Sequence, residues 1–253
     1  MRVALFYELM EPTRETMITS PDNEKLKLVR KLGQKKHREK LGLFVTEGED
    51  LAAAGLAAGH VPKALLVHPN CEIEGEQVEP ELLDRASGLA SGTRVIGIWP
   101  EIWATEVTDV CVFLDALSDP GNMGTIIRTV DALLDATVVV GPGSVDPYAP
   151  ISVRASMGSI FTQPVLKAKI DATPEPRVAM VASGGEWPAG HSTPVTLCLG
   201  SEREGIQHVV LNQCEEAWTI PLREGRAESL NVAAAAAIAC ERISSVAPAG
   251  ESS

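Results

Sequence analysis

The chain has 253 residues, a length that suits one large domain or two smaller ones. Hydrophobic residues make up 45% of the chain and charged residues 22%, which excludes a chain that is disordered throughout. The formal net charge is −12, from 22 Lys and Arg against 34 Asp and Glu, and it argues against a protein that binds nucleic acid over its whole surface. A local basic patch is still compatible with that average.

The sequence lacks the usual signals for a membrane, secretion or a metal. No apolar run reaches the ~18 residues that a membrane span needs, and the opening segment MRVALFYELMEPTRE carries acidic residues where a signal peptide is apolar. The five cysteines form no C-x-x-C pair, and the five histidines form no cluster with them. We therefore expect a cytoplasmic protein with free thiols, no metal site and no membrane contact.

The first half opens with a basic segment. Residues 20–40 hold eight basic and three acidic side chains, a net charge of +5, so the rest of the chain carries −17. Leu26, Val29 and Leu32 fall at helical spacing, which predicts one helix that Ser20 or Asp22 could cap. Such a run is either a solvated helix face or a contact with an anionic partner. For the second case the candidate RNA-binding residues are Lys25, Lys27, Arg30, Lys35, Lys36 and Arg38.

A small α/β unit is expected after the basic segment. Short apolar runs predict strands at 43–46, 64–67 and 93–98, and helical patterns lie near 47–58 and 80–86. Residues 99–109 have no clean periodicity and indicate a boundary.

The second half alternates apolar strands with helices. Strands are expected at 110–117, 137–140, 178–182, 195–199 and 217–220, and helices near 124–134, 206–214 and 230–243. This alternation is typical of a parallel sheet covered on both faces, and such sheets bind ligands at the carboxyl ends of their strands.

The first segment whose residues are candidates for a functional site is FLDALSDPGNMGTIIRT, residues 113–129. Asp119-Pro120-Gly121 indicates a turn, after which Asn122 opens a helix whose free N–H groups face the strand ends. Arg128 follows about two turns later, within reach of a ligand. A capping Asn and a surface Arg are the simple alternative.

Two further segments follow strands. LCLGSEREGI, residues 197–206, is a glycine-bounded turn with Glu202; it has neither the Lys of a P-loop nor the G-x-G-x-x-G of a dinucleotide site. In 220–242, Ser229 and Asn231 begin an Ala-rich helix, where they could simply cap it. A serine hydrolase is disfavoured, because no G-x-S-x-G exists and His191 and His208 have no supporting motif.

In this order and spacing the three segments resemble the motifs of the SpoU (TrmH-type) RNA 2′-O-ribose methyltransferases. The matching residues are Asp119-Pro120-x-Asn122-x-Gly124-x-x-x-Arg128-Thr129, Leu199-Gly200-Ser201-Glu202-x-x-Gly205, and Ile220-Pro221 with Ser229-Leu230-Asn231-Val232. Residues 153–159 resemble the connecting helix of the family. Residues 18–20, the basic segment and Phe44-Val45-x-Glu47-Gly48 resemble the substrate-binding domain of its ribosomal-RNA members.

The resemblance implies an α/β fold with a C-terminal trefoil-knotted, parallel-sheet methyltransferase domain (SPOUT type) and a small N-terminal α/β RNA-binding domain. It also implies S-adenosyl-L-methionine as cofactor, 23S ribosomal RNA as substrate and a homodimer. We expect an extension at 1–17, the RNA-binding domain at 18–100, a linker at 101–110, the methyltransferase domain at 111–246 and a tail at 247–253. The implied catalytic residues are Asn122, Arg128, Glu202, Ser229 and Asn231, and the implied cofactor contacts are Gly141, Gly200, Ile220 and Leu230.

The residue types suit that chemistry. A ribose hydroxyl is a poor nucleophile, so an enzyme must orient it in line with the methyl donor and stabilise the developing alkoxide. Arg128 would supply a fixed cation, either as an electrostatic stabiliser or, as family mechanisms often hold, as a general base; a guanidinium is very hard to deprotonate. A tRNA ribose methyltransferase and a non-catalytic RNA-binding factor on the same fold are the alternatives.

Overall fold

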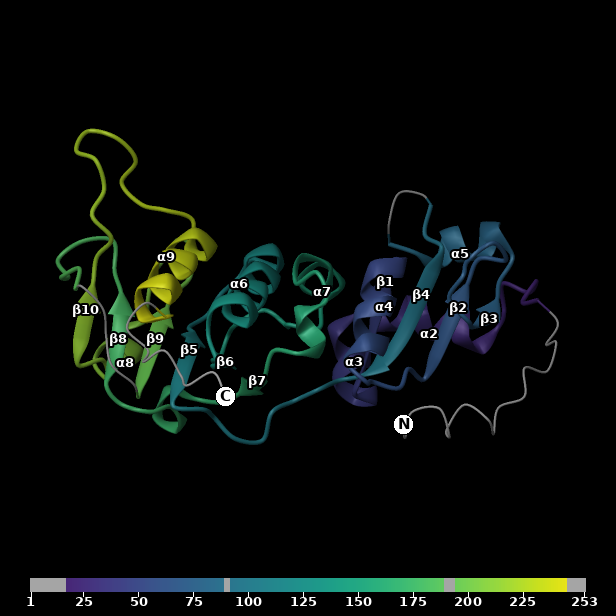
Figure 1. Cartoon of the computed structure of the whole chain (residues 1–253), viewed down its shortest axis with the longest axis horizontal. Coiled ribbons are helices and arrows are strands. Elements are labelled where there is room, and N and C mark those ends of the chain that lie inside the picture. Colours follow the sequence, from purple (N-terminus) through teal and green to yellow (C-terminus); the bar gives the residue numbers. More distant parts are fainter. Residues whose placement is uncertain (1–16, 89–91, 189–193, 245–253) are drawn as a thin grey trace, which may run out of the picture. The chain divides into compact units, whose positions relative to one another are not determined.

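The computed structural model describes residues 17–88, 92–188 and 194–244. The chain divides into two compact units (Figure 1), Met1–Leu56 with Val61–Pro100 and Ala57–His60 with Glu101–Ser253. Each unit has its own sheet, so the two are described separately. Within the described ranges no helix is long and apolar enough to cross a membrane, and no group of His, Cys, Asp and Glu side chains could hold a metal ion.

The first unit is built on a four-stranded sheet in the order β1-β4-β2-β3. Its strands are β1 (Leu43–Glu47), β2 (Ala64–Val67), β3 (Glu76–Gln77) and β4 (Val95–Pro100), and its helices are α2 (Glu24–Leu32), α3 (Lys35–Leu41), α4 (Glu49–Ala57) and α5 (Pro80–Ala86). β4 pairs antiparallel with β1 and β2, whereas β3 runs parallel to β2. The three expected strands and the two expected helices are confirmed; β3 was not expected, because two residues are too short to show a period.

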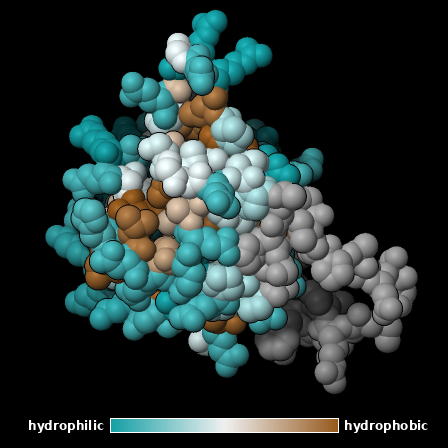
Figure 2. Space-filling model, turned by 90° about the vertical axis from the view of Figure 1, so that its left-hand side faces the viewer, coloured by the Kyte–Doolittle hydropathy of each residue, from teal (hydrophilic) through white to brown (hydrophobic). Residues whose placement is uncertain are grey.

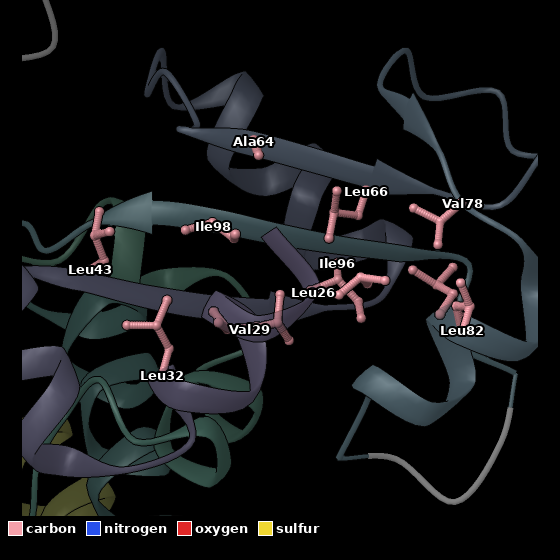
Figure 3. Packing of buried hydrophobic residues seen from close by; sticks show 12 residues of the cluster. Leu26, Val29, Leu32, Leu43, Ala64, Leu66, Val78, Leu82, Ile96 and Ile98 are labelled. Carbon is pink, nitrogen blue, oxygen red and sulfur yellow. The ribbon is translucent and has the colours of Figure 1, made fainter. Parts of the chain in front are cut away.

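The core of the first unit joins α2 to the sheet. Leu26, Val29 and Leu32 lie on one face of α2 and pack in a cluster with Leu66 and Ile96 (Figure 3). A spacing of three residues places these side chains on the same face of a helix. The apolar face expected for the basic segment is therefore confirmed.

The basic segment forms two helices, so the expectation of one helix was wrong. α2 ends at Leu32 and α3 begins at Lys35, with Gly33 and Gln34 between them. The cap of α2 is Asn23, whose side chain accepts a hydrogen bond from the Lys25 N–H at 2.9 Å, and not Ser20 or Asp22. Gly33 is a poor helix former, which explains a break that the lysine spacing alone does not show.

The second unit contains a six-stranded sheet in the order β10-β8-β9-β5-β6-β7, and every neighbouring pair is parallel. The strands are β5 (Val110–Leu114), β6 (Thr137–Val140), β7 (Val165–Lys167), β8 (Arg177–Met180), β9 (Val195–Leu199) and β10 (Glu216–Trp218). The expected parallel sheet and its five strands are confirmed, and β7 is an additional edge strand. All carboxyl ends consequently lie along one edge of the sheet.

Helices cover both faces of this sheet. They are α6 (Pro120–Leu133), α7 (Pro150–Ala155), α8 (His208–Leu211) and α9 (Val232–Ser244), with short 3₁₀ turns at Ser159–Phe161 and Ile170–Ala172. On one face, Val210 of α8 packs in a cluster with Cys111, Phe113 and Cys198 of the strands. α6 packs against α7 and α9 (Figure 1). Gly124 permits the close contact with α7, because a Cβ there would lie 2.1 Å from the Ser152 carbonyl oxygen.

Two helices differ from the expectation. The helix expected near 206–214 is only the four residues of α8, with Gln207 as its N-cap. The connecting helix implied at 153–159 begins earlier, at Pro150, and ends at Ala155. Met157 and Gly158 then take positive φ angles of 51° and 100°, which a helix cannot contain.

Candidate active site

Three loops carry the motif residues at the carboxyl edge of the second sheet. β5 leads into α6, β9 leads into residues 200–206, which we call the motif-2 loop, and β10 leads through residues 219–231 into α9. β5 and β9 are hydrogen-bonded neighbours, with Leu114 paired to Leu199 at their ends. The first and second motifs therefore emerge side by side from the sheet.

The start of α6 fixes the position of Asn122. Asp119 is the N-cap, and its Oδ1 accepts a hydrogen bond from the Asn122 N–H at 2.7 Å. Pro120 occupies the first helical position, where the missing N–H costs nothing. The alternative of Asn122 as the capping residue is therefore wrong, and its side chain is free for other contacts.

A hydrogen-bonded chain of side chains links the three motifs. Asn122 Nδ2 donates to Glu202 Oε1 at 2.6 Å, and Asn122 Oδ1 accepts from Asn231 Nδ2 at 3.0 Å. The other oxygen of Glu202, Oε2, accepts from the Ser118 hydroxyl at 3.0 Å. We call Ser118, Asn122, Glu202 and Asn231 the polar cluster. It brings together three of the five expected catalytic residues and adds Ser118, which no motif pointed out.

The polar cluster keeps Glu202 ionised. Partial burial acts to raise the pKa of this carboxyl, but hydrogen bonds from Asn122, from the backbone at Glu202 and from Ser118 outweigh it and hold the pKa below its ordinary value. A fixed carboxylate consequently lies at the carboxyl edge of the sheet. Each of its oxygens accepts a hydrogen bond from one side chain.

Two hydrogen bonds between its own residues close the motif-2 loop. The N–H of Ser201 donates to the carbonyl of Gly205 and the N–H of Gly205 to the carbonyl of Ser201, both at 3.0 Å. Gly200 lies against the far side of the loop, because a Cβ on it would be 2.1 Å from the carbonyl carbon of Gly205. Gly205 takes a φ of +70°, which L side chains rarely adopt. Gly200 is thus required by close backbone approach and Gly205 by its positive φ angle.

Asn231 has two roles at the start of α9. Its Oδ1 accepts the N–H of Ala233 at 2.9 Å and that of Ala234 at 3.4 Å, as an N-cap does. The same side chain donates from Nδ2 to Asn122. The capping interpretation and the cluster interpretation of Asn231 therefore both hold.

Arg128 and Ser229 stand apart from the polar cluster. Arg128 lies six residues beyond Asn122 on α6, which puts it about 9 Å along the helix and about 120° around it. It is exposed and makes no hydrogen bond or ion pair with the described residues. Ser229 lies in the exposed stretch 221–230, likewise without a hydrogen bond to the described chain.

The four expected cofactor residues lie along the same edge but not in one cavity. Gly141 follows β6 and Gly200 follows β9, and both are buried. Ile220 lines an open cavity of about 460 Å³ with residues 182–184 and 221–228, and Leu230 is 38% exposed beyond it. The projection at the top of Figure 2 is the segment between β10 and α9, hydrophilic at its tip and hydrophobic nearer its base.

Some cationic side chains of the basic segment in the first unit form ion pairs or hydrogen bonds, and others form neither. Lys25 pairs with Glu76, Lys27 with Glu24 at 3.2 Å and Asp22 at 3.5 Å, and Lys35 with Glu39 at 3.9 Å. Arg30 is exposed and donates to the carbonyls of Pro21 and Leu26. Among the described residues, exposed Lys31, Lys36 and Lys40 make no such contact, and we call these three the basic surface.

The expectation that Arg38 contacts RNA was wrong. Arg38 is only 3% exposed, and its Nη1 donates to the carbonyl oxygen of Leu32 at 2.8 Å. The guanidinium therefore ties α3 to the end of α2 and does not face solvent. Burial of one arginine within a basic run is a tertiary effect that residue spacing does not reveal.

Comparison with known proteins agrees with this geometry. The sequence model of the SpoU rRNA Methylase family matches residues 109–241, and that of the MRM3-like substrate binding domain matches residues 23–104. The chain belongs to the SpoU rRNA methylase family. Its membership confirms the expected family, its enzyme class and the α/β fold with a parallel-sheet methylase domain.

Relatives match along nearly the whole chain. The 23S rRNA (guanosine(2553)-2′-O)-methyltransferase RlmP of Bacillus subtilis is 31% identical over 241 residues, covering 87% of this chain and 96% of that protein. A crystal structure of an AdoMet-bound rRNA methyltransferase from Sinorhizobium meliloti is 29% identical with a TM-score of 0.78, covering 89% of this chain and 95% of the other. A TrmH-family RNA methyltransferase structure from Porphyromonas gingivalis is 27% identical with a TM-score of 0.75, covering 90% and 98%.

Proposed function

We propose that the chain transfers the methyl group of S-adenosyl-L-methionine (AdoMet) to a ribose 2′-hydroxyl of RNA, with 23S ribosomal RNA as substrate. The observation that carries the proposal is the polar cluster, in which side chains of all three motifs are hydrogen-bonded at the carboxyl edge of a parallel sheet. RlmP, which is named as a 23S rRNA methyltransferase and aligns along most of both chains, supports the choice of substrate.

The residues at this edge fit AdoMet. A Cβ at Gly141 would lie 2.7 Å from the Leu114 carbonyl oxygen, so this strand end, like the one at Gly200, presents backbone without a side chain. Backbone of this kind can hold an adenosine, with Ile220 and Leu230 as apolar contacts. When bound, AdoMet supplies a methyl group made electrophilic by its sulfonium.

The chain's own residues would orient the hydroxyl and stabilise its negative charge. A guanidinium is very hard to deprotonate, so we assign Arg128 electrostatic stabilisation of the alkoxide and not proton removal. Asn122 is held by Glu202 and Asn231, with one N–H of its amide still available to orient the ribose. Ser229, on the exposed stretch 221–230, would contact the substrate from the third motif.

The first unit would supply affinity for RNA. Lys31, Lys36 and Lys40 are exposed cations with no partner among the described residues, so they can neutralise phosphates without first breaking an ion pair. Contacts with phosphate position an RNA but do not read its sequence. The basic segment thus keeps its proposed RNA-binding role, with the basic surface in place of Arg38 as the main contact. Secondary contacts would come from Lys25, Lys27, Arg30 and Lys35.

A homodimer with a trefoil-knotted methylase domain completes the proposal. Three packed helices carry exposed apolar side chains: Ile151 on α7 at 56%, Leu133 on α6 at 40% and Ile238 on α9 at 38%. A second copy would cover these apolar side chains and could bring polar groups to Arg128, which has no hydrogen bond or ion pair with the described residues. Light scattering of the purified protein tests the dimer, and a monomer at micromolar concentration would contradict it.

The proposal is tested with purified protein and RNA isolated from cells that lack its gene. We expect radioactive methyl from AdoMet to enter 23S RNA and to appear as 2′-O-methylnucleoside after digestion. Transfer to tRNA alone would contradict the substrate. Binding of RNA with no transfer to either RNA would favour a non-catalytic factor and contradict the proposed activity.

A further inference from the structure

Asp115 is a buried carboxyl at the carboxyl edge that lies in the segment 113–129 but outside its matched motif residues. It follows β5 directly and is 1% exposed. Its Oδ2 accepts a hydrogen bond from the backbone N–H of Gln207 at 2.6 Å. A carboxylate in such a position is costly unless it is hydrogen-bonded, so this bond has a large effect on where the groups around it lie.

One residue therefore holds both ends of the motif-2 loop. The backbone N–H of Asp115 donates to the carbonyl of Leu199 at 2.8 Å, at the residue where β9 enters the loop. Its side chain accepts from Gln207, the first residue after the loop. Between these two anchors lie Gly200, an expected cofactor contact, and Glu202, which holds Asn122.

At its far end the loop is supported by the packing of Ile206 against the cluster of Cys111, Phe113 and Cys198, and Asp115 adds a hydrogen bond to the next residue, Gln207. Its internal bonds join Ser201 to Gly205 and fix the shape of the loop, but they do not attach it to the sheet. Ser118 and Asn122 attach the tip through Glu202. Gln207 is the N-cap of the short helix α8, so its bond to Asp115 also sets where that helix starts.

We propose that Asp115 is a positioning residue that fixes the motif-2 loop on the sheet and thereby sets AdoMet affinity without touching the cofactor. The effect on AdoMet rests on the proposed function. The effect on the loop does not, because it follows from the hydrogen bonds of the protein alone. Burial raises the pKa of Asp115, so a neutral side chain that still presents an oxygen to Gln207 fits the same place.

The experiment compares two substitutions at Asp115 in the full chain. Asp115→Ala removes the acceptor, and we expect the dissociation constant of AdoMet, measured by calorimetry, to rise about tenfold, with the amides of Ser201, Gly205 and Gln207 exchanging faster. Asp115→Asn keeps an acceptor oxygen, and we expect an affinity within about threefold of wild type. A positioning role predicts this rescue, whereas a need for charge would not.

Glu215 offers a control that matches the hydrogen bond of Asp115, although its side chain is exposed. Its Oε2 accepts the backbone N–H of Arg177 at 2.6 Å, the same type and length of bond, but at the amino ends of β8 and β10. We expect Glu215→Ala to leave AdoMet affinity unchanged. If Glu215→Ala weakens AdoMet as much as Asp115→Ala does, the effect is general loss of stability and the proposal is wrong.

A second pair of variants acts on the donor, in case Asp115→Ala does not fold. Gln207 has a φ of −63°, which suits proline, so Gln207→Pro removes the N–H while Gln207→Ala keeps it. We expect faster loop exchange in Gln207→Pro only. Unchanged exchange in both Asp115→Ala and Gln207→Pro would overturn the proposal. Faster exchange without AdoMet binding by the wild type would uphold the anchoring of the loop by Asp115 and contradict the proposed function.

Discussion

Asn122 and Glu202 are 80 residues apart in sequence, yet Asn122 Nδ2 lies 2.6 Å from Glu202 Oε1. This bond joins the helix that follows β5 to the loop that follows β9, and those two strands are neighbours in the sheet. The parallel order of the sheet is therefore what converts two separate motifs into one site. The bond also fixes which way the Asn122 amide points, because its oxygen is left for Asn231.

Replacing Asn122 by Ala should lower the rate of methyl transfer about ten- to a hundredfold. The substitution removes two hydrogen bonds of the polar cluster, one of them to a charged carboxylate, and such bonds contribute about 1.5–3 kcal/mol. Steady-state kinetics with AdoMet and 23S RNA measures the change in kcat. Thr125→Ala is the control, since its hydroxyl bonds only the Gly121 carbonyl on the same helix; an equal loss in both variants would mean that the polar cluster has no special role.

Replacing Arg128 by Ala should abolish transfer and leave AdoMet binding intact. The guanidinium is exposed and holds no described part of the fold together, so the fold should not change. Arg128→Lys keeps the charge but loses the planar fork, and we expect it to retain a small part of the activity. Calorimetry with AdoMet and a transfer assay make the measurement, with Arg85→Ala, an exposed arginine of the first unit, as control. Turnover by Arg128→Ala near the wild-type rate would refute the catalytic assignment.

Neutralising the basic surface should weaken RNA binding and its dependence on salt. Each lost phosphate contact reduces the slope of log affinity against log salt by about 0.7–0.9. We expect a clear reduction when Lys31, Lys36 and Lys40 become Gln together. The control changes Lys25 and Lys27, which are already paired with acidic side chains, and its slope should move less. If the slope stays the same without the basic surface, these lysines only keep the helices solvated.

Stability at acid pH should depend on Glu202. Its pKa is lower in the folded protein than its ordinary value, so the unfolded chain binds a proton more readily. The stabilisation from this carboxylate is complete above the ordinary pKa of Glu and is lost as the pH falls through the folded pKa. Urea unfolding at about pH 6 and about pH 3.5 should show a smaller loss in Glu202→Gln than in wild type. An identical loss in both proteins would contradict the assignment.

The five cysteines should react with iodoacetamide in an order set by their surroundings. The neighbouring Cys198 thiol holds the pKa of Cys214 below its ordinary value, and Cys214 is partly exposed. Burial raises the pKa of Cys111 and that of Cys240 to about 12. Because the thiolate is the nucleophile, Cys214 should be modified first near pH 8 and the three buried thiols, Cys111, Cys198 and Cys240, last. Mass spectrometry of a timed reaction gives the order, and early modification of Cys240 would contradict it.

Much of this fold could be predicted from the sequence, because periodicity and strand-like apolar runs are local. The strands at Thr137–Val140 and Val195–Leu199 begin and end where their apolar residues do. The position of Arg38 could not be predicted, because its burial depends on how α3 turns back on α2. The contacts of Asp115 and Ser118 could not be predicted for a similar reason. Their partners are far away in the chain, and neither residue has a distinctive spacing.

Part of the site could be predicted from the motifs, but its hydrogen bonds could not. The motif order indicated that Asn122, Glu202 and Asn231 meet, and they do. Nothing in the spacing showed that Asp119 and not Asn122 caps α6. The angle of about 120° between Arg128 and Asn122 does follow from their six-residue spacing once both lie on one helix. The roles of Arg128 and Ser229 therefore stay predictions that the experiments above address.

The most direct test of the proposed activity maps 2′-O-methyl groups in 23S RNA from cells that lack the gene and carry either the wild-type chain or Arg128→Ala. We predict that one 2′-O-methyl site is absent without the gene, returns with the wild-type chain and stays absent with Arg128→Ala. A 23S methylation pattern that is the same in all three strains would contradict the proposal that this chain methylates ribosomal RNA.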